Sequence, residues 1–122
     1  MSLISSDDME RYRHTARRRK ALAAERRRFR AERGWDVARK AALVLKNDFG
    51  ATDVMVFGSL LRPDYFDDRS DVDIAVKGIP DHRYLRAVAV VTGLDNEIAI
   101  DLIRIEDASQ SLVRQAELGV TL

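Results

Sequence analysis

The chain has no cysteine among its 122 residues, which excludes disulfide bonds and thiolate metal sites. It has two histidines, His14 and His82, and neither has a second histidine at the spacing of a metal site. No apolar run is long enough to cross a membrane, and the first ten residues are polar and acidic, unlike a signal peptide. We therefore expect a cytoplasmic protein with no membrane association and no metal site built from cysteine or histidine.

Charge is spread unevenly along the chain, although the net charge is only +1. Residues 1–34 hold 11 of the 21 Lys and Arg but 5 of the 20 Asp and Glu, a balance of +6 (11 − 5). The remaining residues hold 10 and 15, a balance of −5 (10 − 15). Together with the length and a hydrophobic content of 46%, this predicts a basic N-terminal arm, residues 1–34, followed by one compact acidic domain, residues 35–122.

Two helices are expected before the first strand. Residues 7–33 are rich in Ala, Arg, Glu and Leu and contain no Gly or Pro, which is typical of a helix. Their few apolar residues form no broad stripe, so we expect this helix to be weakly anchored to a core. Residues 35–48 place Trp35, Ala38 and Leu45 on one face, as in an amphipathic helix. We expect a break between the two helices at Gly34.

Apolar segments at residues 53–58, 71–77 and 97–104 predict three strands, with a polar loop over residues 60–70. Helices are expected at residues 81–91 and 107–117, and Gly119 is read as the stop after the last of them. Strands that alternate with helices predict an α/β fold.

Carboxylates gather on one face of two of these strands. Because side chains alternate along a strand, Asp71 and Asp73 share a face, and Asp101 lies on the carboxylate-bearing face of the third strand. The opposite faces are fully apolar, so helices can cover them. If the two strands are neighbours, the three aspartates form one cluster. Such a cluster is costly unless a cation neutralises it, and carboxylates together with phosphate oxygens suit Mg²⁺. Two such ions can support an in-line nucleotidyl displacement.

Gly58 and Ser59 follow the first strand and predict a phosphate site beside the metal. Glycine lets the backbone approach a ligand closely, and Ser59 offers a hydroxyl donor. A helical turn after them would present free amides to phosphate. Each feature alone has a plainer interpretation. A Gly-Ser pair can be an ordinary turn, Asp-x-Asp a solvated strand start, and Asp101 a charge on the wet face of an edge strand.

Taken together, Gly58-Ser59, the Asp71-x-Asp73 pair and Asp101 within "IAIDLI" resemble the nucleotidyltransferase superfamily of DNA polymerase beta. The small size and the C-terminal ending are similar to the minimal nucleotidyltransferase (MNT) branch, which includes antitoxins encoded beside HEPN-domain ribonuclease toxins. The resemblance covers roughly residues 36–122. It implies the polymerase-beta-like α+β fold, a short mixed sheet with helices on one face and carboxylates on the other, here preceded by a basic helix.

The resemblance also implies roles for individual residues. Asp71 and Asp73 would bind two Mg²⁺ ions, and Asp101 would share the catalytic metal and help to deprotonate the acceptor. Gly58 and Ser59 would hold the triphosphate of ATP. In the antitoxin branch, AMP passes to a tyrosine of the paired toxin. The chain departs from the family pattern in two places. The spacer from Leu60 to Ser70 is one residue longer than the commonest spacing, and Arg62-Pro63 stands where the family usually has Arg-Gly.

Several alternatives stay open at this point. The acceptor could be a small molecule or an RNA end, or the chain could be an antitoxin that neutralises its partner by binding alone. Arg62 could contact phosphate or only solvate its loop. The arginine runs Arg17–Lys20 and Arg26–Arg30 could dock an acidic partner, such as the HEPN-type toxin or a second copy of this chain. They could also bind nucleic acid, or form a solvated helix. No aromatic ladder accompanies them, so base stacking is not favoured.

Overall fold

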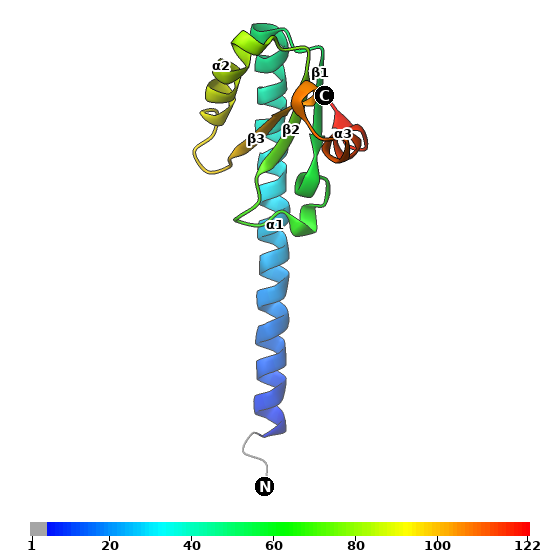
Figure 1. The fold of residues 1–122 in the computed structure, drawn as a ribbon. Helices are drawn as coiled ribbons and strands as arrows, with labels where there is room; N and C mark the ends of the chain where they lie inside the picture. Colours follow the sequence, from blue (N-terminus) through cyan, green and yellow to red (C-terminus); the bar gives the residue numbers. More distant parts are fainter. Residues whose placement is uncertain (1–4) are drawn as a thin grey trace.

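The computed structural model describes residues 5–122, so the first four residues of the predicted arm lie outside the described part. Figure 1 shows a small sheet packed against one half of a long helix, whose other half projects alone towards the N-terminus. The order of elements, with η for 3-10 helices, is α1 (Ser6–Phe49), β1 (Asp53–Phe57), η1 (Gly58–Leu61), η2 (Pro63–Tyr65), β2 (Val72–Lys77), α2 (Asp81–Thr92), β3 (Ile100–Arg104), η3 (Ile105–Asp107), α3 (Gln110–Glu117) and β4 (Val120–Thr121). The predicted combination of helices and strands is confirmed.

The predicted helix break at Gly34 is wrong, because α1 runs through it as one helix of 44 residues. Gly34 is buried, and a Cβ added to it would lie 2.8 Å from Leu60 Cδ1 and 3.2 Å from the Phe66 ring. The missing side chain therefore lets the segment after β1 pack directly on the helix. Gly34 marks a close packing contact and not the end of a helix. The continuous helix also crosses the boundary predicted between residues 34 and 35.

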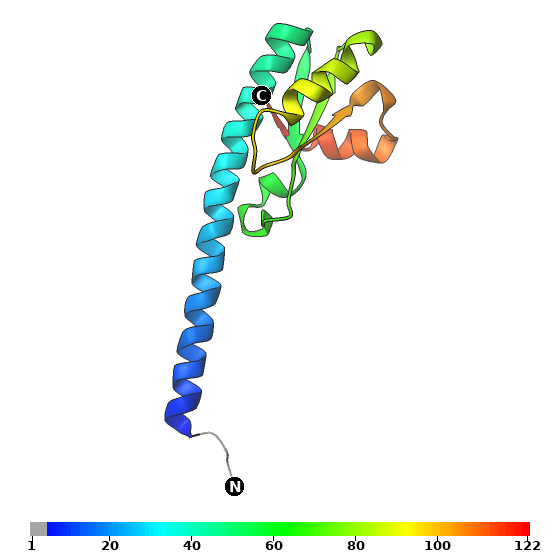
Figure 2. The same cartoon turned by 90° about the vertical axis from the view of Figure 1, so that its left-hand side faces the viewer.

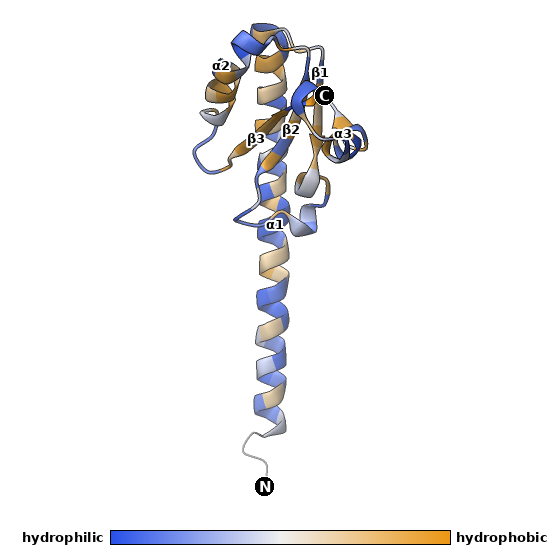
Figure 3. Ribbon diagram, viewed as in Figure 1, coloured by the Kyte–Doolittle hydropathy of each residue, from blue (hydrophilic) through white to orange (hydrophobic). Residues whose placement is uncertain are grey.

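The N-terminal part of α1 has no neighbour in the described structure. The first buried residue of the helix is Ala31, and residues 10–22 are all exposed. Figure 3 shows the apolar residues concentrated in the sheet and the segments around it, while the projecting part of α1 is mostly hydrophilic. The weak anchoring predicted for residues 7–33 therefore holds for residues 10–22, whereas Ala31 at the other end of that range is buried and Arg30 and Arg33 bind the body. No helix within residues 5–122 has the length and apolar character needed to span a membrane.

The four strands form one mixed sheet in the order β3-β2-β1-β4. β1 is antiparallel to both β2 and β4, and β2 is parallel to β3. Strand β3 begins at Ile100 and not at Glu97, because residues 97–99 belong to the loop before it. Strand β4 was not predicted, since its two residues follow the glycine that was read as a stop.

Helices cover both faces of the sheet, although unequally. The core between the sheet, α1 and α2 contains the apolar side chains Val54, Val56, Val72, Ile74, Val76, Ile100 and Leu102. A smaller cluster on the opposite face joins Leu112 and Ala116 of α3 to Phe57 and Ala75. Figure 2 shows α3 on the far side of the sheet from α1. The expectation of helices on one face is therefore right for α1 and α2 but wrong for α3.

Candidate active site

Two of the predicted aspartates lie side by side in the sheet. β2 and β3 are parallel neighbours, and Asp73 is the register partner of Asp101. Both belong to the residue set that faces away from α1, where Ala75 and Ile103 continue the same two rows. Asp101 is exposed and Asp73 is about half-buried. Asp71 is exposed and lies immediately before β2, two residues from Asp73. The neighbouring strands that were assumed from the sequence are thus observed.

Gly58 lies directly against this pair. It follows Phe57, which is the register partner of Asp73 on the other neighbouring strand, β1. Its φ angle of 77° is in the left-handed region that favours glycine. A Cβ added to Gly58 would overlap with Oδ2 of Asp73. Two separate constraints, backbone conformation and space, therefore require glycine between the end of β1 and the carboxylate.

The electrostatics of the site centre on Asp73. The pKa of the Asp73 carboxyl is raised from its usual 3.8 to about 6, mainly by burial and in smaller part by the negative charges of Asp101 and Asp71. A carboxyl group with a raised pKa is one whose negative charge is poorly compensated by its surroundings. A cation bound beside Asp73 and Asp101 would supply that compensation.

The chemistry of the donor set fits a hard divalent cation such as Mg²⁺, which prefers carboxylate oxygens and keeps positions for phosphate oxygens and water. No group of three or more Asp, Glu or His side chains that could hold an ion is preformed within residues 5–122. The carboxylates that the sheet brings together here are those of Asp73 and Asp101, with Asp71 two residues before Asp73.

A surface pocket of about 560 Å³ begins at Gly58 and brings together the three residues predicted to bind nucleotide. Its lining comes from three segments of the chain: Gly58, Ser59, Leu61, Arg62, Tyr65, Gln115 and Leu118. The other four residues, Leu61, Tyr65, Gln115 and Leu118, were not singled out from the sequence. The last two come from α3 and its end, far along the chain from Gly58. The pocket shares Gly58 with the carboxylate pair, so it adjoins the aspartates.

The unusual proline of this loop has a local explanation. Pro63 occupies the first position of η2, where a missing backbone N–H costs no hydrogen bond. The longer spacer is also less polar than predicted, because Leu60 and Phe66 are fully buried against α1. The loop is therefore anchored at both ends of η2, and its extra residue does not detach it from the body.

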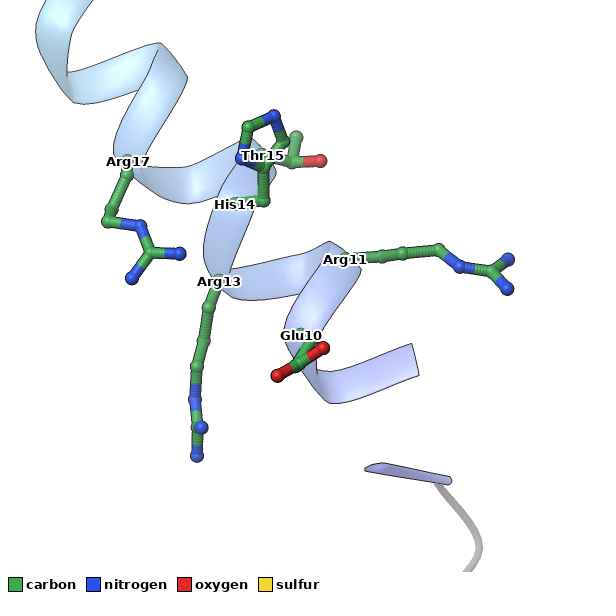
Figure 4. A pocket seen from close by; sticks show the side chains of 6 residues that line it. All are labelled: Glu10, Arg11, Arg13, His14, Thr15 and Arg17. Carbon is green, nitrogen blue, oxygen red and sulfur yellow. The ribbon is translucent and has the colours of Figure 1, made fainter. Parts of the chain in front are cut away.

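A second hollow lies on the projecting part of α1 and is formed by Glu10, Arg11, Arg13, His14, Thr15 and Arg17. All six residues are exposed and belong to one helix, and Figure 4 shows their side chains pointing in different directions from it. This hollow is open helix surface and does not enclose a ligand.

Comparison with known families agrees with this geometry. A sequence model of the nucleotidyltransferase domain matches residues 38–118, about two thirds of the chain. The chain belongs to the nucleotidyltransferase domain family. This family lies within the polymerase beta superfamily, so the observed mixed sheet and its neighbouring helices have the expected fold.

Membership of the nucleotidyltransferase family supports transfer of a nucleotidyl group as the class of activity. Every predicted site residue, from Gly58 to Asp101, lies within the matched range, and so do the further pocket residues. The N-terminal part of α1 lies outside it. No curated protein and no solved structure matches the chain.

Proposed function

We propose that this nucleotidyltransferase transfers AMP from ATP to a tyrosine hydroxyl of a partner protein. The proposed partner is the HEPN-type ribonuclease toxin encoded by the adjacent gene, which the transfer would silence in the cytoplasm. The observation that supports transfer is the Asp73 and Asp101 pair, in register on neighbouring strands and next to the pocket that begins at Gly58. Arg62 and Tyr65 on the pocket rim are exposed, which suits an acceptor carried by a second protein.

In this proposal, the carboxylates bind metal and the residues of the pocket bind the triphosphate. Asp71, Asp73 and Asp101 would hold two Mg²⁺ ions, which when bound neutralise triphosphate charge and make the acceptor hydroxyl easier to deprotonate. Gly58 and Ser59 hold the triphosphate through backbone amides and the serine hydroxyl, while Arg62 contributes positive charge from the rim.

The reaction forms one bond and breaks another at the α-phosphorus of ATP. The acceptor oxygen bonds to this phosphorus while the bond to the departing pyrophosphate oxygen breaks. The carboxylate of Asp101 accepts the hydroxyl proton. The products are AMP-tyrosine and pyrophosphate.

The projecting part of α1 is the proposed docking surface for the partner. Residues 6–29 carry nine Lys and Arg against four Asp and Glu, and the structure leaves this segment without contacts to the body until its last turns. An acidic surface on the partner protein would complement it. Binding to nucleic acid phosphates, or to the acidic body of a second copy of this chain, is the competing role for the same charges.

Removing residues 1–26 tests the docking role without touching the body, since Arg30 and later residues remain. We expect the truncated chain to keep its melting temperature and to lose the partner in a pull-down. Retention of the partner would exclude residues 6–26 as its docking surface. Salt-dependent RNA binding that disappears on truncation would favour the nucleic-acid role instead.

The central experiment is intact-mass spectrometry of the adjacent gene product after co-expression with this chain. We expect a gain of whole AMP units with the native chain and none with the Asp71→Asn, Asp73→Asn double variant. Asp68→Asn is the matched control, because Asp68 is an exposed carboxylate in the loop just before the site. An unchanged mass with a stable complex in every case would favour an antitoxin that acts by binding alone. An unchanged toxin mass together with AMP found on a small molecule or an RNA end would show that the acceptor is that molecule and not a tyrosine of the toxin.

A further inference from the structure

Arg30 of α1 holds two loops that are far apart in the sequence. Its Nε donates to the carbonyl oxygen of Asp67 at 2.8 Å. Its Nη2 donates to the carbonyl oxygens of Ser70 at 3.3 Å and Glu97 at 3.4 Å. The guanidinium also lies over the Phe66 ring, with 5.6 Å between its central carbon and the ring centroid. One side chain thus joins the segment before β2 to the segment before β3.

Arg33 lies one turn further along α1 and binds the loop before β3 through the carboxylates of that loop. It pairs with Asp95 at 3.3 Å and with Glu97. Asp95 in turn accepts hydrogen bonds from the backbone N–H groups of Glu97 and Ile98, at 2.9 and 2.8 Å. These hydrogen bonds and the neighbouring Arg33 lower the pKa of Asp95, so it stays ionised as a partner for the arginine.

The two anchored loops are those that deliver the carboxylates of the site. Asp67 and Ser70 directly precede Asp71 and the start of β2, and Glu97 precedes Asp101 in β3 by four residues. Beyond the loops, the N–H of Val72 donates to the carbonyl oxygen of Ala99 at 2.9 Å, where the two strands begin to pair. The spacing between the carboxylate-bearing strands therefore starts from a junction that Arg30 and Arg33 hold.

We propose that Arg30 and Arg33 are positioning residues that set the distance between Asp73 and Asp101, and thereby the affinity of the site for a divalent cation. This rests on the proposed function of the aspartates as metal ligands. In the sequence Arg30 reads as one more cation of the basic arm. In the structure its donors point at main-chain carbonyls of the body, so it belongs to the site and not to the docking surface.

The geometry of the guanidinium distinguishes this role from charge alone. A lysine at position 30 keeps the positive charge but offers a single nitrogen, which cannot reach three carbonyl oxygens of two loops at once. Arg30→Lys therefore tests the bridging of the loops while leaving the electrostatic field of the helix nearly unchanged. Arg26→Lys is the matched control, because Arg26 is an exposed arginine one turn earlier on the same helix.

The experiment measures Mn²⁺ binding to the full chain by electron paramagnetic resonance, in the presence of a non-hydrolysable ATP analogue. Changes to groups that orient metal ligands typically weaken affinity by about tenfold or more. We expect Arg30→Lys to weaken Mn²⁺ binding by about this factor and Arg26→Lys to leave it unchanged. Affinity for the ATP analogue without metal should be the same in all three proteins, because neither arginine lines the pocket.

Circular dichroism at the temperature of the binding experiment shows whether each variant is folded. If Arg30→Lys does not fold, Glu97→Gln replaces it, since it removes the ion pair with Arg33 at an exposed side chain. Here we expect a loss of about two- to threefold in Mn²⁺ affinity. Native-like Mn²⁺ affinity in a folded Arg30→Lys or Glu97→Gln protein would overturn the positioning role. Absence of Mn²⁺ binding by the native chain would instead refute the proposed function itself.

Discussion

Replacing Asp73 by asparagine should make the metal-free protein more stable while abolishing nucleotidyl transfer. The carboxylate of Asp73 is half-buried beside two other carboxylates, so the folded protein bears a cost for its negative charge. Asparagine has nearly the same shape without that charge. The variant therefore separates the electrostatic cost of the site from its function.

The size of the effect follows from the pKa of Asp73. A rise from 3.8 to about 6 corresponds to about 3 kcal/mol of destabilisation when the group is ionised. Because the side chain is only partly buried, solvent screening reduces this to about 1 kcal/mol. The folded protein binds the proton more tightly than the unfolded chain. Its free energy of unfolding therefore falls as pH rises from about 4 to about 6 and is level above that.

Thermal unfolding followed by circular dichroism, in the presence of a chelator, measures this cost. Near pH 8 we expect Asp73→Asn to unfold about 3 °C above the native chain, and near pH 4 we expect the two to coincide. Addition of Mg²⁺ and the non-hydrolysable ATP analogue should then raise the melting temperature of the native chain only. A variant that is less stable than the native chain at pH 8 would refute the claim that Asp73 is an uncompensated carboxylate.

Three further predictions concern the same site and its support. Gly58→Ala should abolish transfer and lower stability by about 1–3 kcal/mol in urea unfolding. The reason is that the φ angle of Gly58 is left-handed and a new Cβ would overlap with Asp73. A fully active and stable variant would contradict this. Gly34→Ala should lower stability in the same assay, because overpacking against Leu60 costs about 1–3 kcal/mol and exceeds the gain in helix propensity of about 1 kcal/mol; a net gain would show that Leu60 relaxes freely. Mn²⁺ affinity should fall as pH drops through about 6, where protons compete at Asp73; a flat profile between about pH 5 and 8 would place the ion elsewhere.

The carboxylate face was predictable because strand periodicity is a local property. Asp71, Asp73 and Asp101 alternate with apolar residues. Once the strands were recognised, the sequence therefore predicted that these carboxylates lie on the face opposite the apolar side chains. The pairing of β2 with β3 was an assumption at that level. The register that makes Asp73 and Asp101 partners is observed only in the folded sheet.

Other features depended on contacts between distant segments. From the local sequence alone, Gly34 could equally end a helix or make room for Phe66. Only the packing of the loop after β1 against α1 shows that it makes room. The placement of α3 on the carboxylate face follows from the burial of Ala116 against Ala75, two residues more than 40 positions apart. Gln115 lines the pocket that begins at Gly58 for the same reason.

The sequence by itself determined the chemistry of this protein: a Gly-Ser turn, three aspartates at strand spacing, and a basic segment with too few apolar residues to be buried. These are consequences of side-chain type and of the two- and 3.6-residue periods, which act over a few residues. The tertiary structure alone decided which arginines serve the site. Arg30 is one of several in a basic run, and only the approach of two loop backbones to α1 separates it from its exposed neighbours.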